Sequence, residues 1–154
     1  MIRLFVAIGL PDPVKRDLTL LGYGLPGARW IEPENMHLNL RFIGEVDGGV
    51  CEDIRESLAE VQLESFTLTL KGTGFFPPKQ HPHTLWAGIE KSEPLTILHS
   101  RVEAALARVG ISRDRRKYSP HVTLARLSDA PIQRVAGWLA TNALFKTGAF
   151  PVGS

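Results

Sequence analysis

Residues 37–40 have the sequence His-Leu-Asn-Leu and residues 121–124 have the sequence His-Val-Thr-Leu, so one pattern occurs in both halves of the chain. In an extended strand, alternate side chains share a face. Each segment therefore presents a histidine and a short polar residue on one face and two aliphatic residues on the other. The repetition predicts a pseudo-twofold domain of two lobes, each with one histidine strand, whose polar faces meet in a central cleft.

The rest of the pattern indicates an α+β fold. Strands are expected at residues 2–9, 28–31, 36–43, 66–70, 84–89, 121–127 and 145–152. Helices are expected from Pro13 to about Leu21, from about Val50 to Gln62, from Glu93 to Val109 and from Pro131 to about Thr141. Asp12 and Asp129 are the predicted N-caps of the first and last helices, and Gly44 is the predicted end of the first histidine strand. Hairpin-like connections in mid-chain favour antiparallel sheets with the helices outside.

The composition is typical of one globular domain. A chain of 154 residues, 44% hydrophobic and 22% charged, can bury a core without disulfides or metal ions, which predicts a single domain over residues 1–154. No apolar run approaches the roughly 20 residues of a membrane span, and residues 1–8 lack the features of a secretory signal. We therefore expect a cytoplasmic protein without a membrane segment, in which the single Cys51 has a structural role.

The net charge of +2 is too small to demand a nucleic-acid partner. One basic cluster does occur shortly before the second histidine motif, and it consists of Arg113, Arg115, Arg116 and Lys117. Two interpretations stay open for this cluster. It is either a solvated charged loop, or a group of cations that attracts a phosphate-bearing substrate to the cleft.

Two histidines in one cleft favour a reaction that needs one proton removed and another supplied. Because the ordinary imidazole pKa is about 6.5, one ring can be neutral while the other is charged near neutrality. Displacement at phosphorus has this requirement, since water loses a proton as it attacks and the departing alkoxide gains one. Asn39 and Thr123 could donate hydrogen bonds to the phosphate oxygens, and Arg41 could add positive charge. These residues predict a phosphoesterase whose acid and base are His37 and His121.

Further segments surround the two motifs in a fixed order, namely Arg29-Trp30, Pro33–His37, Phe42–Glu45, Gly74–Pro77, Leu85–Gly88 and Ser119–Arg126. Together with the motifs they resemble the two-histidine (2H) phosphoesterases, and within them the LigT-like RNA 2′,3′-cyclic phosphodiesterases. The likeness runs from residue 2 to about residue 150. It implies hydrolysis of RNA or nucleotide 2′,3′-cyclic phosphates to 2′-phosphomonoesters without metal or cofactor. In some members the reverse reaction joins RNA ends.

The resemblance also implies roles for individual residues and partners. His37 would protonate the 3′ leaving oxygen and His121 would activate water, while Arg126 would contact the phosphate and Phe5 or a neighbour would stack on the base. Strict alternation places Arg126 on the face opposite His121, so a β-bulge or a strand end is needed to bring it round. The implied partners are RNA ends or nucleotides with a 2′,3′-cyclic phosphate, tRNA fragments among them, and we expect a monomer.

Two departures from the family pattern and two alternatives remain. Asn39 stands where members have threonine or serine, so we expect reduced or altered activity. Members continue past the equivalent of Phe150, so the chain is either shortened, with an exposed sheet edge, or lacks a tail.

One alternative function is a nucleotide-binding module with little turnover, and the other is a zinc site built from the histidines of His81-Pro82-His83 with His37 or His121. We expect His99 to be an ordinary, partly exposed helix residue.

Overall fold

A computed structural model of the chain describes residues 1–62, 64–76 and 82–152. The strands are β1 (Ile2–Gly9), β2 (Ala28–Trp30), β3 (His37–Val46), β4 (Phe66–Leu68), β5 (Leu70–Phe76), β6 (Thr84–Ile89), β7 (His121–Leu127) and β8 (Phe150–Val152). The helices are α1 (Asp12–Thr19), α2 (Gly48–Ala59), α3 (Glu93–Arg108) and α4 (Ile132–Thr141), with a short 3-10 helix, Pro33–Asn35, before β3.

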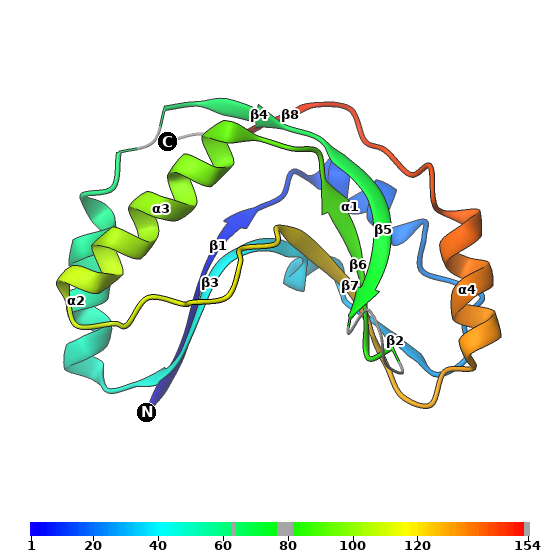
Figure 1. The fold of residues 1–154 in the computed structure, drawn as a ribbon, viewed down its shortest axis with the longest axis horizontal. Coiled ribbons are helices and arrows are strands. Elements are labelled where there is room, and N and C mark those ends of the chain that lie inside the picture. Colours follow the sequence, from blue (N-terminus) through cyan, green and yellow to red (C-terminus); the bar gives the residue numbers. More distant parts are fainter. Residues whose placement is uncertain (63, 77–81, 153–154) are drawn as a thin grey trace.

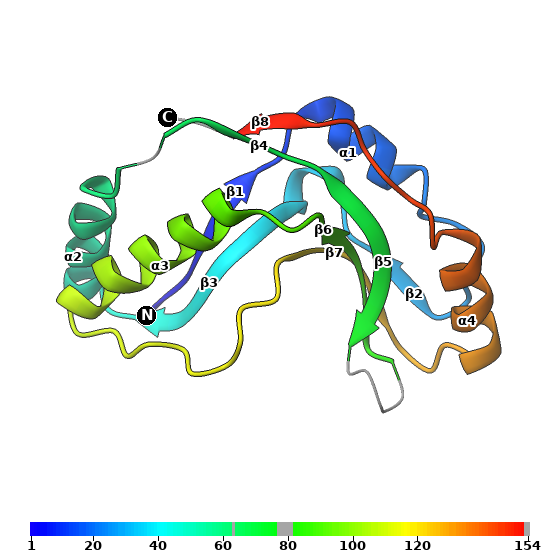
Figure 2. The ribbon, with the colours of Figure 1, turned by 45° about the horizontal axis from the view of Figure 1, so that its top comes forward.

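One curved sheet passes through both lobes in the strand order β1-β3-β7-β6-β5, and β2 pairs with the C-terminal part of β7, over Ala125–Leu127 (Figure 1). Strands β4 and β8 form a separate pair, and every strand pairing among the described residues is antiparallel. Helices α2 and α3 lie at the β1–β3 end of the molecule, and α1 and α4 lie at the opposite end (Figure 2). The α+β class, the antiparallel pairing and the outer helices are confirmed.

The two lobes join where the histidine strands meet. Strands β3 and β7 are paired through Leu38 and Val122, and both of these side chains are completely buried. An antiparallel register through this pair sets His37 level with Thr123 and Asn39 level with His121. A twofold rotation about the pair therefore exchanges the two motifs, in agreement with the pseudo-twofold relation that the repeated pattern predicts.

The apolar faces of the helices complete the core on either side of this junction. Helix α3 contributes Leu95, Val102 and Leu106, which are all buried. At the other end, the buried indole of Trp138 in α4 donates a hydrogen bond from Nε1 to the carbonyl oxygen of Leu21, just beyond α1, at 3.0 Å. This contact fixes α4 against α1, so each lobe has its own pair of helices.

The predicted N-caps of the first and last helices are wrong. The residue before α1 is Pro11, with Asp12 inside the first turn, and the residue before α4 is Pro131. Neither helix has a side-chain hydrogen bond at its N-cap. A proline side chain has no acceptor, so neither N-cap satisfies an N–H of the first turn. In α1, Pro13 lacks an N–H and therefore removes one of the donors that a cap would satisfy. Asp129 instead has a φ of 54° in the turn before Pro131.

Several strand ends also differ from the prediction. The strand expected at residues 66–70 is divided into β4 (Phe66–Leu68) and β5, which continues to Phe76. Strand β3 continues past Gly44 to Val46, because the pairing of β1 with β3 contains irregularities that absorb the glycine, whose φ is +99°. The last predicted strand is regular only over Phe150–Val152. Within the described residues, no helix is long and apolar enough to span a membrane.

The glycine at position 74 is required by the close approach of strand β6. A Cβ built on Gly74 would overlap the indole ring of Trp86, which stands opposite it in the β5–β6 ladder. We therefore expect Gly74→Ala to lower the free energy of unfolding by about 1–3 kcal/mol, because overpacking forces the ring or the strand to move. Urea unfolding monitored by tryptophan fluorescence measures this change.

Gly137→Ala is the matched control for this prediction. Nothing lies within 4 Å of a Cβ at Gly137, which occupies the interior of α4. Alanine there is expected to raise the free energy of unfolding by about 0.5–1 kcal/mol, since it lowers the entropy cost of the helix. Equal effects of the two substitutions would contradict the steric argument at Gly74.

Candidate active site

Two adjoining pockets lie over the polar faces of the histidine strands. The larger, of about 620 Å³, is lined by His121 and opens toward the segment between α3 and β7. The smaller, of about 390 Å³, is lined by His37 and opens toward β1. Four residues line both pockets, namely Asn39, Phe42, Thr123 and Arg126. Asn39, Thr123 and Arg126, three of the predicted phosphate-binding residues, thus lie with Phe42 on the common floor between the two histidines.

The imidazole of His121 is oriented by the backbone and by two aromatic rings. Its Nδ1 lies 2.7 Å from the carbonyl oxygen of Ser119, which can only accept, so Nδ1 carries the proton in this contact. The ring of Phe76 meets it edge-on at 4.9 Å, and the indole of Trp86 lies at 6.2 Å. In neutral His121 the Nε2 atom therefore holds the lone pair, as a proton acceptor requires.

His37 lies on the opposite side of the shared floor. Its ring is stacked on Phe5 of β1, with the centroids 4.8 Å apart and the planes 13° from parallel. Burial of the ring, reinforced by the positive charge of Lys15, lowers the pKa of His37 below its ordinary value. The free protein therefore holds His37 mainly in the neutral form at pH 7. Phe5 itself is about half exposed, and its expected role in base stacking stays a prediction.

Arg126 reaches the site through the β-bulge that the alternation argument requires. Across the β6–β7 ladder, Leu85 pairs with Ala125 and Trp86 pairs with Thr123, so Leu124 is an extra residue in β7. Leu124 and Ala125 are both buried, and the alternation is reset after them. Arg126 consequently lines both pockets beside Thr123, and its Nη1 donates to the Thr84 hydroxyl at 3.3 Å.

The side chains of Asn39 and Thr123 make no hydrogen bond with a described residue, and both face the shared floor. Their donors are therefore available to a ligand. Unlike a threonine hydroxyl, the Asn39 amide carries two N–H donors on a longer side chain. A phosphate held by this amide would consequently sit slightly further from β3 than one held by a hydroxyl.

Arg41 is occupied by the protein itself. Its Nη1 donates to the Glu103 carboxylate at 2.9 Å, and its Nη2 donates to the carbonyl oxygen of Ser112 at 2.8 Å. Glu103 is only 5% exposed and also accepts a hydrogen bond from the backbone N–H of Asp114. Arg41 lines the larger pocket, and its expected contact with phosphate stays a prediction. Through its contacts with Glu103 and Ser112, Arg41 attaches the loop between α3 and β7 to strand β3.

The loop of residues 112–120 is called the strap because it crosses from the end of α3 to the start of β7 (Figure 2). Besides the Arg41 and Glu103 contacts, the hydroxyl of Tyr118 donates to the carbonyl oxygen of Asn39 at 2.9 Å. Burial raises the pKa of Tyr118, so this hydroxyl stays protonated. The strap thus links the backbone of the first histidine motif to Ser119, whose carbonyl orients the second histidine.

His99 lies in α3 and is partly exposed, as expected, but it also makes a specific contact. Its ring is stacked on Tyr118 at 3.9 Å with nearly parallel planes, and it lines the larger pocket. Burial lowers the pKa of His99. The sequence gives no signal for this contact, nor for the placement of Phe42, Phe76 and Glu103, because each depends on residues distant along the chain.

The zinc alternative receives no support from the described residues. Within residues 1–62, 64–76 and 82–152, no three histidine, cysteine, aspartate or glutamate side chains are grouped to hold a metal ion. His81, one of the ligands considered, lies outside the described residues.

Comparison with known families matches residues 24–154 to the 2′-5′ RNA ligase superfamily. The chain belongs to this superfamily. The resemblance to the 2H phosphoesterases, first suggested by the paired motifs, is thereby confirmed. The match includes both histidine motifs, the bulged end of β7 and the strap.

Curated relatives within the superfamily include two named RNA 2′,3′-cyclic phosphodiesterase. The protein from Thermotoga maritima is 35% identical over 136 residues, which cover 84% of this chain and 72% of the relative. The protein from Archaeoglobus fulgidus is 33% identical over 132 residues, which cover 81% of this chain and 72% of the relative.

Solved structures share the fold over nearly the whole chain. A protein from Thermus thermophilus has a TM-score of 0.79 at 26% identity, and the match covers 98% of this chain and 84% of that protein. E. coli LigT complexed with 3′-AMP has a TM-score of 0.76 at 25% identity, and the match covers 97% of this chain and 83% of LigT.

The effect of Lys15 on the pKa of His37 can be measured directly. Because the Lys15 cation lowers that pKa, Lys15→Gln is expected to raise it, while burial against Phe5 still holds it below the ordinary histidine value. Titration of the His37 ring by NMR, assigned with His37→Gln, measures the shift. An unchanged or lowered pKa in Lys15→Gln would show that the two side chains do not interact.

Proposed function

We propose that the protein hydrolyses RNA or nucleotide 2′,3′-cyclic phosphates to 2′-phosphomonoesters without a metal ion. The observation that supports this most strongly is the single polar floor between His37 and His121, whose free donors come from Asn39, Thr123 and Arg126. Such donors suit a phosphate with a developing negative charge. The superfamily relatives with this activity in their names agree with the proposal.

In the proposed reaction His121 is the base and His37 is the acid. Water attacks phosphorus as His121 Nε2 takes its proton, and the bond from phosphorus to O3′ breaks as His37 gives a proton to O3′. The fixed Nδ1 contact to Ser119 supports the base role, because it leaves Nε2 free and stabilises the imidazolium that forms. His37 is neutral in the free protein, and a bound phosphate anion would favour its protonated form.

The decisive experiment compares the wild type with His37→Ala and His121→Ala on 2′,3′-cyclic AMP in excess EDTA, with phosphorus NMR to identify the product. We expect the wild type to form the 2′-phosphate, and each substitution to lower kcat by about 10²–10⁴-fold, since each removes one proton transfer. Turnover that EDTA abolishes, or that survives both substitutions, would overturn the proposal.

Asn39 is expected to contribute a phosphate donor in place of the family hydroxyl. Asn39→Ala should lower kcat by about 10- to 100-fold, at the lower end of the loss for one lost donor because the amide is exposed. Asn39→Thr should retain or exceed the wild-type rate, since it restores a donor close to β3. The same assay with the 2′-phosphate product as inhibitor measures ground-state binding. A rate in Asn39→Ala equal to the wild type would exclude this role.

A binding module with little turnover is the second candidate, because the chain differs from the family pattern at Asn39. It would bind a 2′-phosphomononucleotide tightly and show negligible hydrolysis in the assay above. The sequence-based prediction of a cytoplasmic monomer that acts on RNA ends, tRNA fragments included, belongs to the proposal of an enzyme.

A further inference from the structure

The strap carries more positive charge than its own structure uses. Arg113, Arg115 and Lys117 are exposed and form no ion pair or hydrogen bond with a described residue. Arg116, by contrast, is paired with Asp114 through its guanidinium and its backbone N–H. Three uncompensated cations within five residues repel one another, so their arrangement suits an anionic partner.

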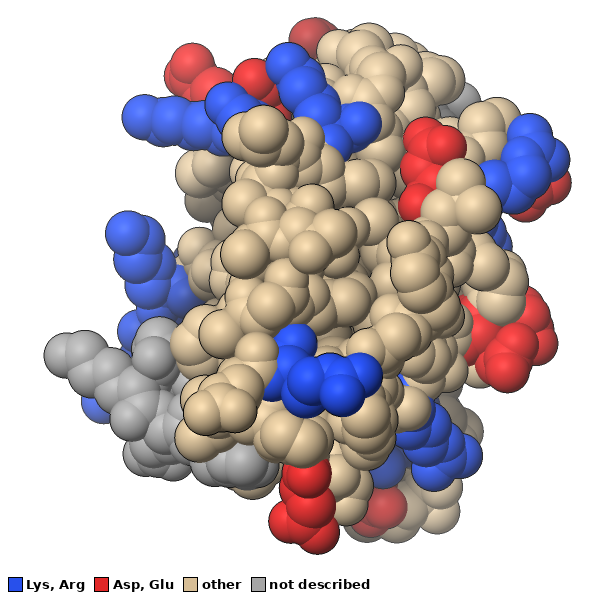
Figure 3. Space-filling view, turned by 90° about the vertical axis from the view of Figure 1, so that its right-hand side faces the viewer, with Lys and Arg blue, Asp and Glu red and all other residues tan. Residues whose placement is uncertain are grey.

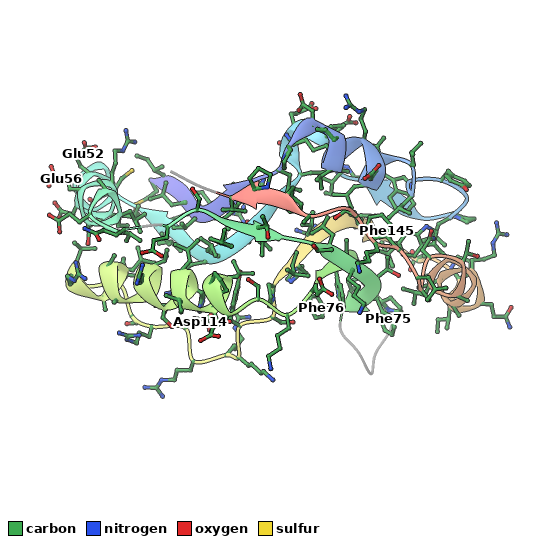
Figure 4. All side chains as sticks on the ribbon, turned by 90° about the horizontal axis from the view of Figure 1, so that it is seen from above. Glu52, Glu56, Phe75, Phe76, Asp114 and Phe145 are labelled. Carbon is green, nitrogen blue, oxygen red and sulfur yellow. The ribbon has the colours of Figure 1, made fainter. Side chains whose placement is uncertain are left out.

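The strap holds these cations at a fixed place beside the cleft. Its backbone is attached at Ser112 and Asp114 through Arg41 and Glu103, and near its other end through Tyr118 and Ser119. Figure 4 shows side chains tipped with nitrogen that project away from the ribbon near Asp114. A charged segment that is already ordered loses little conformational freedom when it binds, which favours a specific contact over a diffuse one.

The charged segment is continuous with the pocket of His121. Lys117 and Arg116 line that pocket, together with the aromatic rings of Tyr118 and Phe76. A volume of about 620 Å³ exceeds what one phosphate needs. Cations along a groove combined with aromatic side chains are the usual means of binding single-stranded nucleic acid. The pocket therefore extends from the reacting phosphate toward the free cations.

The opposite lobe has a different surface. On the face over α4, Lys and Arg are interspersed with Asp and Glu on a largely uncharged background (Figure 3). Mixed charges of this kind give little net attraction to a polyanion. The strap therefore differs in charge from this face of the molecule.

We propose that the strap binds the sugar–phosphate backbone of an RNA strand whose 2′,3′-cyclic phosphate end lies between the histidines. The proposal rests on the proposed function and names its substrate class. An oligonucleotide is then a better substrate than a mononucleotide, because its additional phosphates reach Arg113, Arg115 and Lys117. The advantage lies in KM, because Arg113 and Arg115 line neither pocket and Lys117 lines only the larger one, so these side chains act on binding.

The test uses the double variant Arg113→Gln/Arg115→Gln and the control Lys91→Gln/Arg134→Gln. Both remove two exposed cations, and Lys91 and Arg134 lie outside the strap and both pockets. The wild type and the two double variants are assayed with 2′,3′-cyclic AMP and with an RNA pentanucleotide ending in a 2′,3′-cyclic phosphate, over a range of salt concentrations.

We expect the strap variant to leave kcat/KM for the mononucleotide unchanged and to raise KM for the pentanucleotide by about tenfold at low salt. The slope of log KM against log salt should decrease by about 1.4, at about 0.7 for each lost phosphate contact with a single strand. The control variant should behave as the wild type on both substrates.

Two outcomes would overturn the proposal. If the control raises KM for the pentanucleotide as much as the strap variant does, the attraction comes from overall charge. If neither variant changes it, the strap is a solvated loop or faces a partner other than RNA. If the wild type and both variants hydrolyse neither substrate, the proposed function fails. Fluorescence anisotropy with a labelled pentanucleotide that ends in a 2′-phosphate then makes the same comparison for binding alone.

Discussion

The pairing of Leu38 with Val122 is the constraint on which the rest of the structure depends. Through this pair, strands β3 and β7 join the two lobes into one sheet, and both side chains are completely buried. Because neighbouring residues on a strand point to opposite faces, burying this pair turns His37, Asn39, His121 and Thr123 toward the cleft. A slip of one residue would bury the polar side chains instead. The hydrophobic core therefore sets the positions of the two histidines.

Different surroundings give the two histidines different properties. His121 has a protonated Nδ1 held by a backbone carbonyl and is enclosed by Phe76 and Trp86, which lie on a separate hairpin. His37 has a ring stacked on Phe5, and its pKa is lowered by burial and by Lys15. The sequences of the two motifs are nearly the same, so this asymmetry comes from the neighbouring elements. An acid and a base within one pseudo-symmetric site require such a difference.

The strap couples the two lobes a second time, and it does so through polar contacts. Glu103 is the centre of this coupling, because its buried carboxylate accepts hydrogen bonds from Arg41 and from the backbone of Asp114. A buried carboxylate without these donors would be strongly unfavourable, so the strap and β3 hold each other in place. Tyr118 and Ser119 extend the same connection to Asn39 and His121. The segment that orients the proposed base is thus also the one that displays the free cations.

Local patterns in the sequence determined the element types, the two histidine strands, the family and the polar residues of the site, because strand alternation and short motifs depend on neighbours along the chain. They also indicated that Arg126 needs a bulge, which Leu124 supplies. The extension of β3 beyond Gly44, the pairing of Arg41 with Glu103 and the stacking of His99 on Tyr118 were decided by the tertiary structure. The physical reason is that the β1–β3 pairing and these side-chain contacts join residues far apart in sequence. Whether such residues approach one another depends on how the lobes pack.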